Sequence, residues 1–146
     1  MDWPHKRSRA RAVALQLLFQ HDHNPNLERA VLERFAQDRL QPLGDTEMWS
    51  FCLGLYDGVL ANLDEIDRRL GEAAENWRLQ RMAAVDRNVL RLGSYELLFM
   101  PGTPAGVAID EAIELARRFG SADSPGFVNG VLDRLRQQQK PSSSVE

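Results

Sequence analysis

Apolar residues recur at spacings of three and four along the chain, whereas runs of alternating β-branched residues are nearly absent. This spacing places apolar side chains on one face of an α-helix, so we expect an all-α protein. Asparagine, proline and glycine interrupt the pattern and divide the chain into segments. The expected helices span residues 8–21, 26–40, 46–70, 77–100, 104–119 and 125–137.

Two of these helices carry more detailed expectations. In the second helix, Leu27, Val31 and Phe35 lie on one side and mark its apolar face. The third helix is expected to bend or break near Asn62, which would give about seven helices in all.

Several residues predict where the later helices begin and end. Thr103 is expected to cap a helix whose first residue is Pro104. Gly120 suits the left-handed conformation that ends this helix. Ser124 followed by Pro125 is a cap signal for the last helix.

Residues 71–76 are the expected boundary between two halves, because glycine, small residues and charges interrupt the apolar pattern there. We therefore expect two small helical bundles in sequence, over residues 1–75 and 76–138. Residues 139–146 are polar and aperiodic, which predicts a disordered tail. With 146 residues, 43% of them hydrophobic, the chain can bury a proper core without a metal or a disulfide.

Basic residues are concentrated at the start of the chain. The first eleven residues carry a charge of about +3, from Lys6, Arg7, Arg9 and Arg11 against Asp2. The rest of the chain keeps 14 of the 18 basic and 20 of the 21 acidic residues and carries −6. A local basic segment on an acidic protein predicts an anionic partner, and RNA or DNA phosphate is the obvious candidate.

The basic segment continues into the first expected helix, which would fix its geometry. At about 100° per residue, Arg7 and Arg11 share one side, while Arg9 points elsewhere and lies close to the stripe that holds Gln16. On the residues alone, the alternative is a solvated tail without a partner.

No catalytic or metal-binding arrangement is evident from the residue pattern. His21 and His23 do not face one another on a helix, and no cysteine lies nearby to complete a metal site. Carboxylates are expected on solvated surfaces in pairs with arginine, as for Asp64 and Arg68 at i, i+4. We therefore expect neither an enzyme nor a bound cofactor.

Glycines and the single cysteine suggest packing rather than chemistry. Gly54 with Gly58, and Gly126 with Gly130, lie inside helices without a preceding strand, so close helix contact is expected rather than a phosphate-binding loop. Cys52 lies in an apolar stretch, which favours a core thiol in a reducing compartment. Because no signal sequence or membrane-length apolar run occurs, we expect a cytoplasmic protein.

Three segments carry a resemblance to a known family. The longest is VAIDEAIELARRFGSADSPGFVNGVLDR at residues 107–134, joined by VDRNVLRLGSYEL at 85–97 and by the arginine-rich start that leads into AVALQLLFQ. In these blocks and their order, the chain resembles the NusB family of bacterial transcription antitermination factors. The resemblance covers nearly all of the chain except its tail.

The resemblance implies a fold of two helical bundles and a role in assembly rather than catalysis. Proteins of this family pair with the ribosomal small-subunit protein NusE, bind the boxA element of nascent single-stranded RNA and join the transcription elongation complex, notably on ribosomal RNA operons. Arginine contacts to phosphate would supply affinity that falls with salt, and unstacked bases would supply sequence choice.

The resemblance also carries over individual RNA-binding positions. Phe19 stands where the family often has tyrosine, and on the residues alone it is either a core residue or a base-stacking one. Asp86 and Arg91 match positions near RNA, and Arg87 would add charge there. The expected RNA-binding residues are Lys6, Arg7, Arg9, Arg11, Gln16, Phe19, Asp86, Arg87 and Arg91.

A second set concerns the ribosomal partner. Asp123 matches a position that affects this pairing, and Glu111 and Phe127 are candidates nearby. The alternative for Asp123 is that it only helps to cap the last helix.

Two rival functions use the same fold. One is a ribosome-assembly factor or general RNA chaperone, which would not distinguish boxA from scrambled RNA. The other is the NusB-like front domain of ribosomal RNA cytosine methyltransferases, which need a further Gly-rich domain for S-adenosylmethionine. The oligomeric state is open between an active monomer and a homodimer that buries the basic face.

Overall fold

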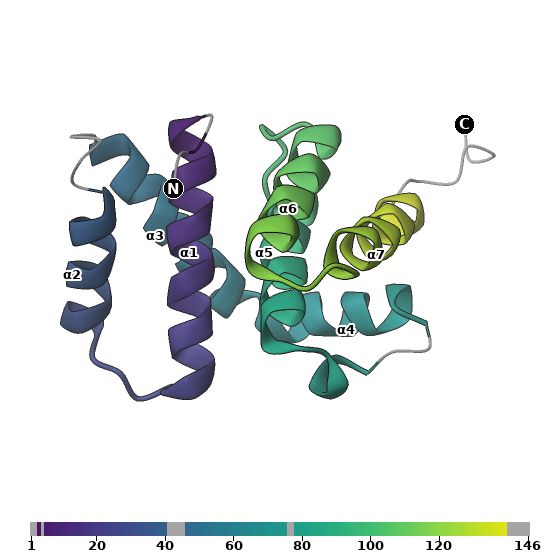
Figure 1. Cartoon of the computed structure of the whole chain (residues 1–146), viewed down its shortest axis with the longest axis horizontal. Coiled ribbons are helices and arrows are strands. Elements are labelled where there is room, and N and C mark those ends of the chain that lie inside the picture. The colour runs from purple at the N-terminus through teal and green to yellow at the C-terminus, as the bar shows by residue number, and fades with distance from the viewer. Residues whose placement is uncertain (1–2, 4, 41–45, 76–77, 140–146) are drawn as a thin grey trace. The chain divides into compact units, whose positions relative to one another are not determined.

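The computed structural model of the chain is helical in every element of its described part, as predicted (Figure 1). It divides into two compact units, Met1–Ala61 and Asn62–Glu146. The expected tail beyond residue 139 and the expected helix start at residue 77 lie outside the described residues. The structure describes residues 3, 5–40, 46–75 and 78–139.

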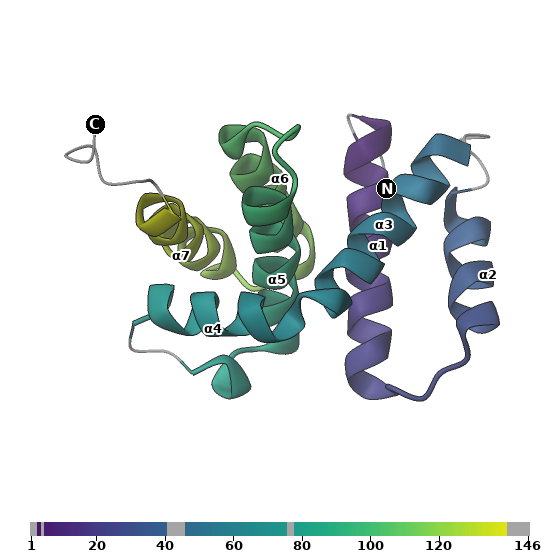
Figure 2. The ribbon, with the colours of Figure 1, turned by 180° about the vertical axis from the view of Figure 1, so that it is seen from behind.

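The first unit consists of α1 (Lys6–His23), α2 (Arg29–Leu40) and α3 (Thr46–Ala61), and each of these helices contacts the other two. Figure 2 shows α3 crossing α1 obliquely. Buried residues lie on nearly every side of α1 between positions 8 and 18. Burial on so many sides makes α1 the centre of the unit.

The inward face of α2 differs from the expected one. Leu32, Ala36 and Leu40 are only 5%, 0% and 2% exposed, whereas Val31 is 47% exposed and Phe35 is half-buried. Both sets of residues are spaced four apart, so spacing alone does not select between them. The small side chain of Ala36 between two leucines lets α2 approach its neighbours closely, which favours that face.

The second unit begins at Asn62, one helix earlier than the boundary expected at residues 71–76. The backbone leaves the helical conformation at Asn62 (φ −116°, ψ 21°), which confirms the expected break, and its carbonyl accepts a hydrogen bond from the Ile66 N–H at 2.9 Å. The helix that follows, α4 (Leu63–Ala73), packs on α5 (Ala84–Phe99) and α7 (Ser124–Gln139). These contacts make α4 part of the second unit.

The start of α5 and the start of α6 (Ala105–Phe119) also depart from expectation. The helix expected at residues 77–100 is shorter, because a three-residue 3-10 helix, η2 (Leu79–Arg81), and an extended residue precede Ala84. Pro104 has an extended ψ of 142° and therefore lies just before α6 instead of forming its first turn.

Gly120 ends α6 in an extended conformation (φ −100°, ψ −165°), so the expected left-handed residue is wrong. Glycine is required there for space: an added Cβ would lie 2.5 Å from Ser124 Oγ and 2.8 Å from the Ala116 carbonyl oxygen. The cap expected at Ser124 is wrong: α7 already begins at Ser124, one residue earlier than predicted, and the Ser124 Oγ accepts a hydrogen bond from the Ser121 N–H at 3.0 Å instead of from the first turn of the helix.

Gly93 is the glycine that permits close helix packing in the second unit. An added Cβ on Gly93 in α5 would lie 2.9 Å from Leu132 in α7 and 3.1 Å from Ala112 in α6. The close contact expected at Gly54 and Gly126 is wrong, because an added Cβ at either position meets nothing within 4 Å. Helix packing therefore relies on a glycine that the paired spacing did not mark.

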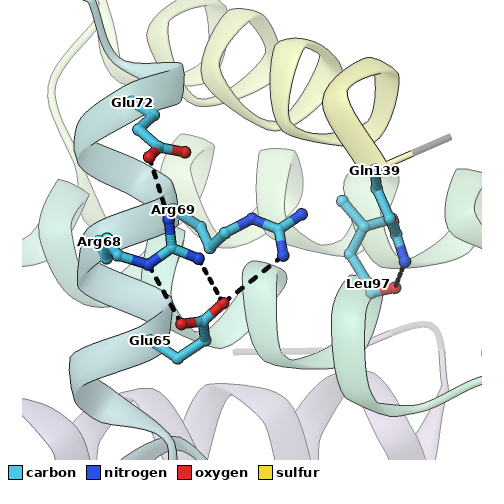
Figure 3. A network of polar contacts seen from close by, with 6 residues as sticks. All are labelled: Glu65, Arg68, Arg69, Glu72, Leu97 and Gln139. Carbon is cyan, nitrogen blue, oxygen red and sulfur yellow. Dashed lines mark hydrogen bonds and ion pairs between the residues drawn. The ribbon is translucent and has the colours of Figure 1, made fainter. Parts of the chain in front are cut away.

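The exposed side of α4 carries a network of charges (Figure 3). Arg68 donates to Glu65 through Nε at 3.2 Å and Nη2 at 2.7 Å, and to Glu72 through Nη1 at 3.0 Å. The pair expected between Asp64 and Arg68 is wrong, because the glutamates at i−3 and i+4 take the guanidinium instead. In the same view, Gln139 Nε2 donates to the Leu97 carbonyl at 3.5 Å and joins the end of α7 to α5.

Candidate nucleic-acid interface

The first turns of α1 place Arg7 and Arg11 on one side, as the helical spacing predicted. Their guanidinium carbons lie 4.8 Å and 5.3 Å from the centre of the Phe51 ring in α3, within the range of a cation–π interaction. Arg7 Nη2 also lies 3.6 Å from Glu47 Oε2. Phe51 thus fixes two arginines that are one helical turn apart.

The basic residues of this segment differ in exposure. The Arg7 side chain is 52% exposed and Lys6 is exposed, so both can reach a ligand in solution. Arg11 is only 4% exposed, and its position beside Phe51 makes it part of the packing between α1 and α3. The segment therefore combines charges that face the solvent with one that supports the helix.

Arg9 points away from this pair and reaches the end of α2. Its Nε and Nη2 donate to the backbone carbonyl of Arg39 at 3.1 Å and 2.8 Å. A positive charge at a helix C-terminus is favourable because the last carbonyls carry partial negative charge. This contact adds Arg39 to the neighbourhood of the basic segment. No local sequence signal could have found it, since the two residues are 30 positions apart.

Phe19 lies on the surface, so the core alternative for it is wrong. It is 37% exposed, and its ring centre lies 4.5 Å from that of His23. His23 Nδ1 lies 2.9 Å from the Phe19 carbonyl oxygen, while the His21 ring meets the Tyr56 ring edge-on at 6.3 Å. An aromatic side chain at this position is available for stacking on a base.

Gln16 is half-buried on α1, and its side-chain Oε1 is buried without a hydrogen-bond partner. That oxygen lies beneath the surface of the unit and is not exposed to a ligand in solution.

The remaining expected RNA-binding residues belong to α5 in the second unit. Arg91 is 13% exposed and binds Asp67 through two hydrogen bonds of 2.9 Å, a partner that the sequence pattern did not reveal. Arg87 is half-buried, and its Nη1 donates to the carbonyls of Leu79 at 3.2 Å and Met82 at 3.3 Å. Asp86 is half-buried, with Oδ1 buried and unpartnered.

The structure therefore distributes the expected RNA-binding residues over two helices in two units. On α1 it brings together a basic segment and places an aromatic ring further along the same helix. On α5 it commits two guanidinium groups to internal hydrogen bonds. The α1 residues are Lys6, Arg7, Arg9, Arg11, Gln16 and Phe19, and the α5 residues are Asp86, Arg87 and Arg91.

The expected partner residues lie on α6 and at the start of α7. The carbonyl of Asp123 accepts a hydrogen bond from the Phe127 N–H at 3.1 Å, while the Asp123 side chain is exposed. The backbone carbonyl of Asp123 thus accepts a hydrogen bond from the first turns of α7, while its carboxylate lies at the surface. Phe127 at the start of α7 and Glu111 on α6 are both half-buried.

Within the residues that the structure describes, no three histidine, cysteine, aspartate or glutamate side chains are arranged to hold a metal ion. Burial raises the pKa of the Cys52 thiol to about 12, which keeps it protonated and unreactive near neutral pH. None of the described helices combines the length and apolar character that a membrane span requires.

A model of the NusB family matches residues 8–137 of the chain. The chain belongs to the NusB family. A relative, the transcription antitermination protein NusB of Desulfatibacillum aliphaticivorans, is 43% identical over 130 residues, which cover 89% of each chain. The resemblance identified from the sequence blocks is thereby confirmed.

Solved NusB structures share the fold. The structure of NusB from T. maritima is 38% identical, with a TM-score of 0.82 and 99% of both chains covered. A structure of the antitermination factors NusB and NusE in complex with double-stranded RNA is similar at 22% identity, with a TM-score of 0.77, covering 93% of this chain and 99% of that one. At that identity the second likeness concerns the NusB fold alone.

Proposed function

We propose that this chain is a transcription antitermination factor that binds boxA RNA together with the ribosomal protein NusE and supports transcription of ribosomal RNA operons. The observation that carries the proposal is the 43% identity, over 89% of both chains, to a transcription antitermination protein of the NusB family. The protein acts by assembly in the cytoplasm and performs no catalysis of its own.

The surface of α1 supports RNA binding. Lys6 and Arg7 present positive charge to the solvent, and Phe19 further along the same helix offers an exposed ring. Phosphates bind the charges with an affinity that falls as salt rises, while a ring stacks on an unpaired base. Arg9 and Arg11 hold the segment in place, and the half-buried Gln16 lies between Arg11 and Phe19 along the same helix.

The charge balance supports a basic protein partner. Outside the basic segment the chain carries −6, and this excess would repel RNA at a distance. A ribosomal protein that covers acidic surface would remove that repulsion and strengthen RNA binding. NusE is the partner in the solved complex of related fold. We assign Glu111, Asp123 and Phe127 to its binding surface, and Asp86, Arg87 and Arg91 to an RNA contact on α5.

Titration of fluorescently labelled boxA RNA with the full chain tests the proposal. The titration is run with and without NusE and at two salt concentrations. Tighter binding with NusE and a marked loss of affinity at higher salt are expected. Equal affinity with and without NusE would overturn the cooperative assembly.

A scrambled RNA of equal length is the control for sequence choice. Weaker binding of the scrambled RNA is expected for an antitermination factor. Equal binding of both RNAs would instead indicate a ribosome-assembly factor or general RNA chaperone. Sedimentation of the free protein and of the complex distinguishes an active monomer from a homodimer that must dissociate before RNA binds.

A further inference from the structure

The flank of α2 carries an exposed stripe that the fold does not use. Val31, Phe35 and Arg39 are spaced four apart, so they follow one another along one side of the helix. Val31 is 47% exposed, Phe35 is half-buried and Arg39 is exposed. The face of α2 that packs in the core of the unit is the neighbouring one, formed by Leu32, Ala36 and Leu40. The stripe of apolar, aromatic and cationic side chains is therefore available to bind a ligand.

Arg39 is held on the ring of Phe35. Its guanidinium carbon lies 3.4 Å from the ring centre, a stacking distance. Throughout the described part of the chain, no carboxylate lies within ion-pair distance of Arg39. Arg29 at the other end of α2 differs, since it binds both Asp57 and Glu33. The charge of Arg39 is therefore oriented by an aromatic ring and not neutralised.

The end of α2 is fastened to the basic segment of α1. The two hydrogen bonds from Arg9 end on the backbone carbonyl of Arg39 itself. The start of α1 and the end of α2 therefore lie side by side, and the residue that carries the Arg39 guanidinium is hydrogen-bonded to the basic segment.

We propose that Arg39, held on the ring of Phe35, makes an additional single-stranded RNA contact that extends the surface of α1 onto α2. The inference rests on the proposed RNA-binding function. One face of the guanidinium lies on the ring, and its other face stacks on an unpaired base, while its charge attracts the adjoining phosphate. Phe35 acts as a positioning residue, because it holds the guanidinium plane without meeting the RNA.

Arg39→Gln is the decisive variant, with Arg34→Gln as its matched control. Glutamine keeps the backbone carbonyl that Arg9 uses and removes only the charge and the guanidinium plane. Arg34 is exposed on the same helix, and five positions at about 100° each turn it about 140° away from Arg39. Both variants lose one positive charge, so a difference between them reports on position.

The measurement is the affinity of each variant for labelled boxA RNA, with NusE present, over a series of salt concentrations. For Arg39→Gln we expect a loss of about fivefold or more, and a slope of log affinity against log salt that is shallower by about 0.7. Arg34→Gln should keep the affinity and slope of the unsubstituted chain.

Phe35→Leu separates positioning from charge. Leucine keeps an apolar side chain but removes the ring face, so we expect weaker binding with an unchanged salt slope. Combining it with Arg39→Gln should weaken binding no further than Arg39→Gln alone, because both act through one guanidinium. Circular dichroism melting verifies that each variant is folded, and Arg39→Gln decides the question if Phe35→Leu does not fold.

Two negative results of this experiment would lead to different conclusions. If the unsubstituted chain binds the RNA and Arg39→Gln binds it equally well, or if Arg34→Gln loses as much affinity, the α2 contact is overturned while the proposed function stands. If the unsubstituted chain does not bind boxA RNA with NusE present, the proposed function is overturned and the α2 contact with it.

Discussion

Arg91 of α5 and Asp67 of α4 form a bidentate ion pair in which Nε and Nη2 each lie 2.9 Å from a carboxylate oxygen. Arg91 also donates through Nη1 to Asn88 Oδ1 at 3.3 Å. The side chains of the pair are only 13% and 29% exposed, so water screens it weakly. The pair joins α4 to α5, and it gives a structural task to an arginine that family resemblance places near RNA.

Arg91→Ala should therefore destabilise the fold, by about 2 kcal/mol, since it leaves a partly buried carboxylate without its partner. Arg91→Lys should recover only part of this loss, because an ammonium cannot bind both oxygens in the same plane. Urea denaturation followed by circular dichroism measures the free energy of unfolding of each variant. An unchanged midpoint for Arg91→Ala would show that the pair contributes nothing to stability.

Alanine substitutions at two glycines should have opposite effects. At Gly93, the new Cβ would clash with Leu132 and Ala112, and we expect destabilisation of about 1–2 kcal/mol after the gain in helix propensity is subtracted. At Gly54, inside α3, the new Cβ meets nothing within 4 Å, so Gly54→Ala should stabilise the fold by up to about 1 kcal/mol. Thermal melting of both variants tests this contrast, which fails if the two shifts have the same sign.

The helices were predictable because their pattern of apolar residues is a local property. The seven α-helices in the described residues follow from the spacing of apolar residues and from the residues that interrupt it, including the helix break at Asn62. The face of α2 was not predictable, because Leu32 and Val31 begin equally good stripes and only the neighbouring helices choose between them. The unit boundary was misplaced for the same reason, since the contacts of α4 with α5 and α7 are tertiary.

In the candidate site too, the features set by local helix geometry were predictable and those set by tertiary contacts were not. The common side of Arg7 and Arg11 follows from about 100° per residue and is confirmed by their shared position over Phe51. Which of the two faces the solvent depends on α3 and could not be read from the sequence. The residues that contact predicted site residues, Arg39 and Asp67, lie 30 and 24 positions away from their partners and carry no local signal.

Cys52 should be unreactive in the folded protein. The thiolate is the nucleophile, and burial raises the pKa of this thiol from 9.0 to about 12, so almost no thiolate is present at pH 8. Labelling with a disulfide reagent should be slow in buffer and complete in urea, where the same thiol is exposed. Rapid labelling of the native protein at pH 8 would show that the thiol is accessible.

The same shift predicts how the thiol changes stability with pH. Because the folded pKa lies above the unfolded one, the unfolded chain ionises first, near pH 9. The contribution of Cys52 is therefore fully present below pH 9 and is lost as pH rises towards 12. Cys52→Ala removes this titration, so the stability difference between the two proteins should vary with pH only above pH 9. A difference that changes below pH 8 would contradict the assignment.

Arg7 and Arg11 contact the same ring but should respond differently to substitution by glutamine. Arg7→Gln removes an exposed charge, so RNA affinity should fall, the salt slope should become shallower by about 0.7, and the melting temperature should stay the same. Arg11→Gln removes a buried guanidinium and its stacking on Phe51, so the fold should lose about 1–2 kcal/mol. Each variant is the control for the other, because both remove one charge from one side of α1. If Arg11→Gln leaves stability unchanged and weakens RNA binding as much as Arg7→Gln, then Arg11 contacts the RNA directly.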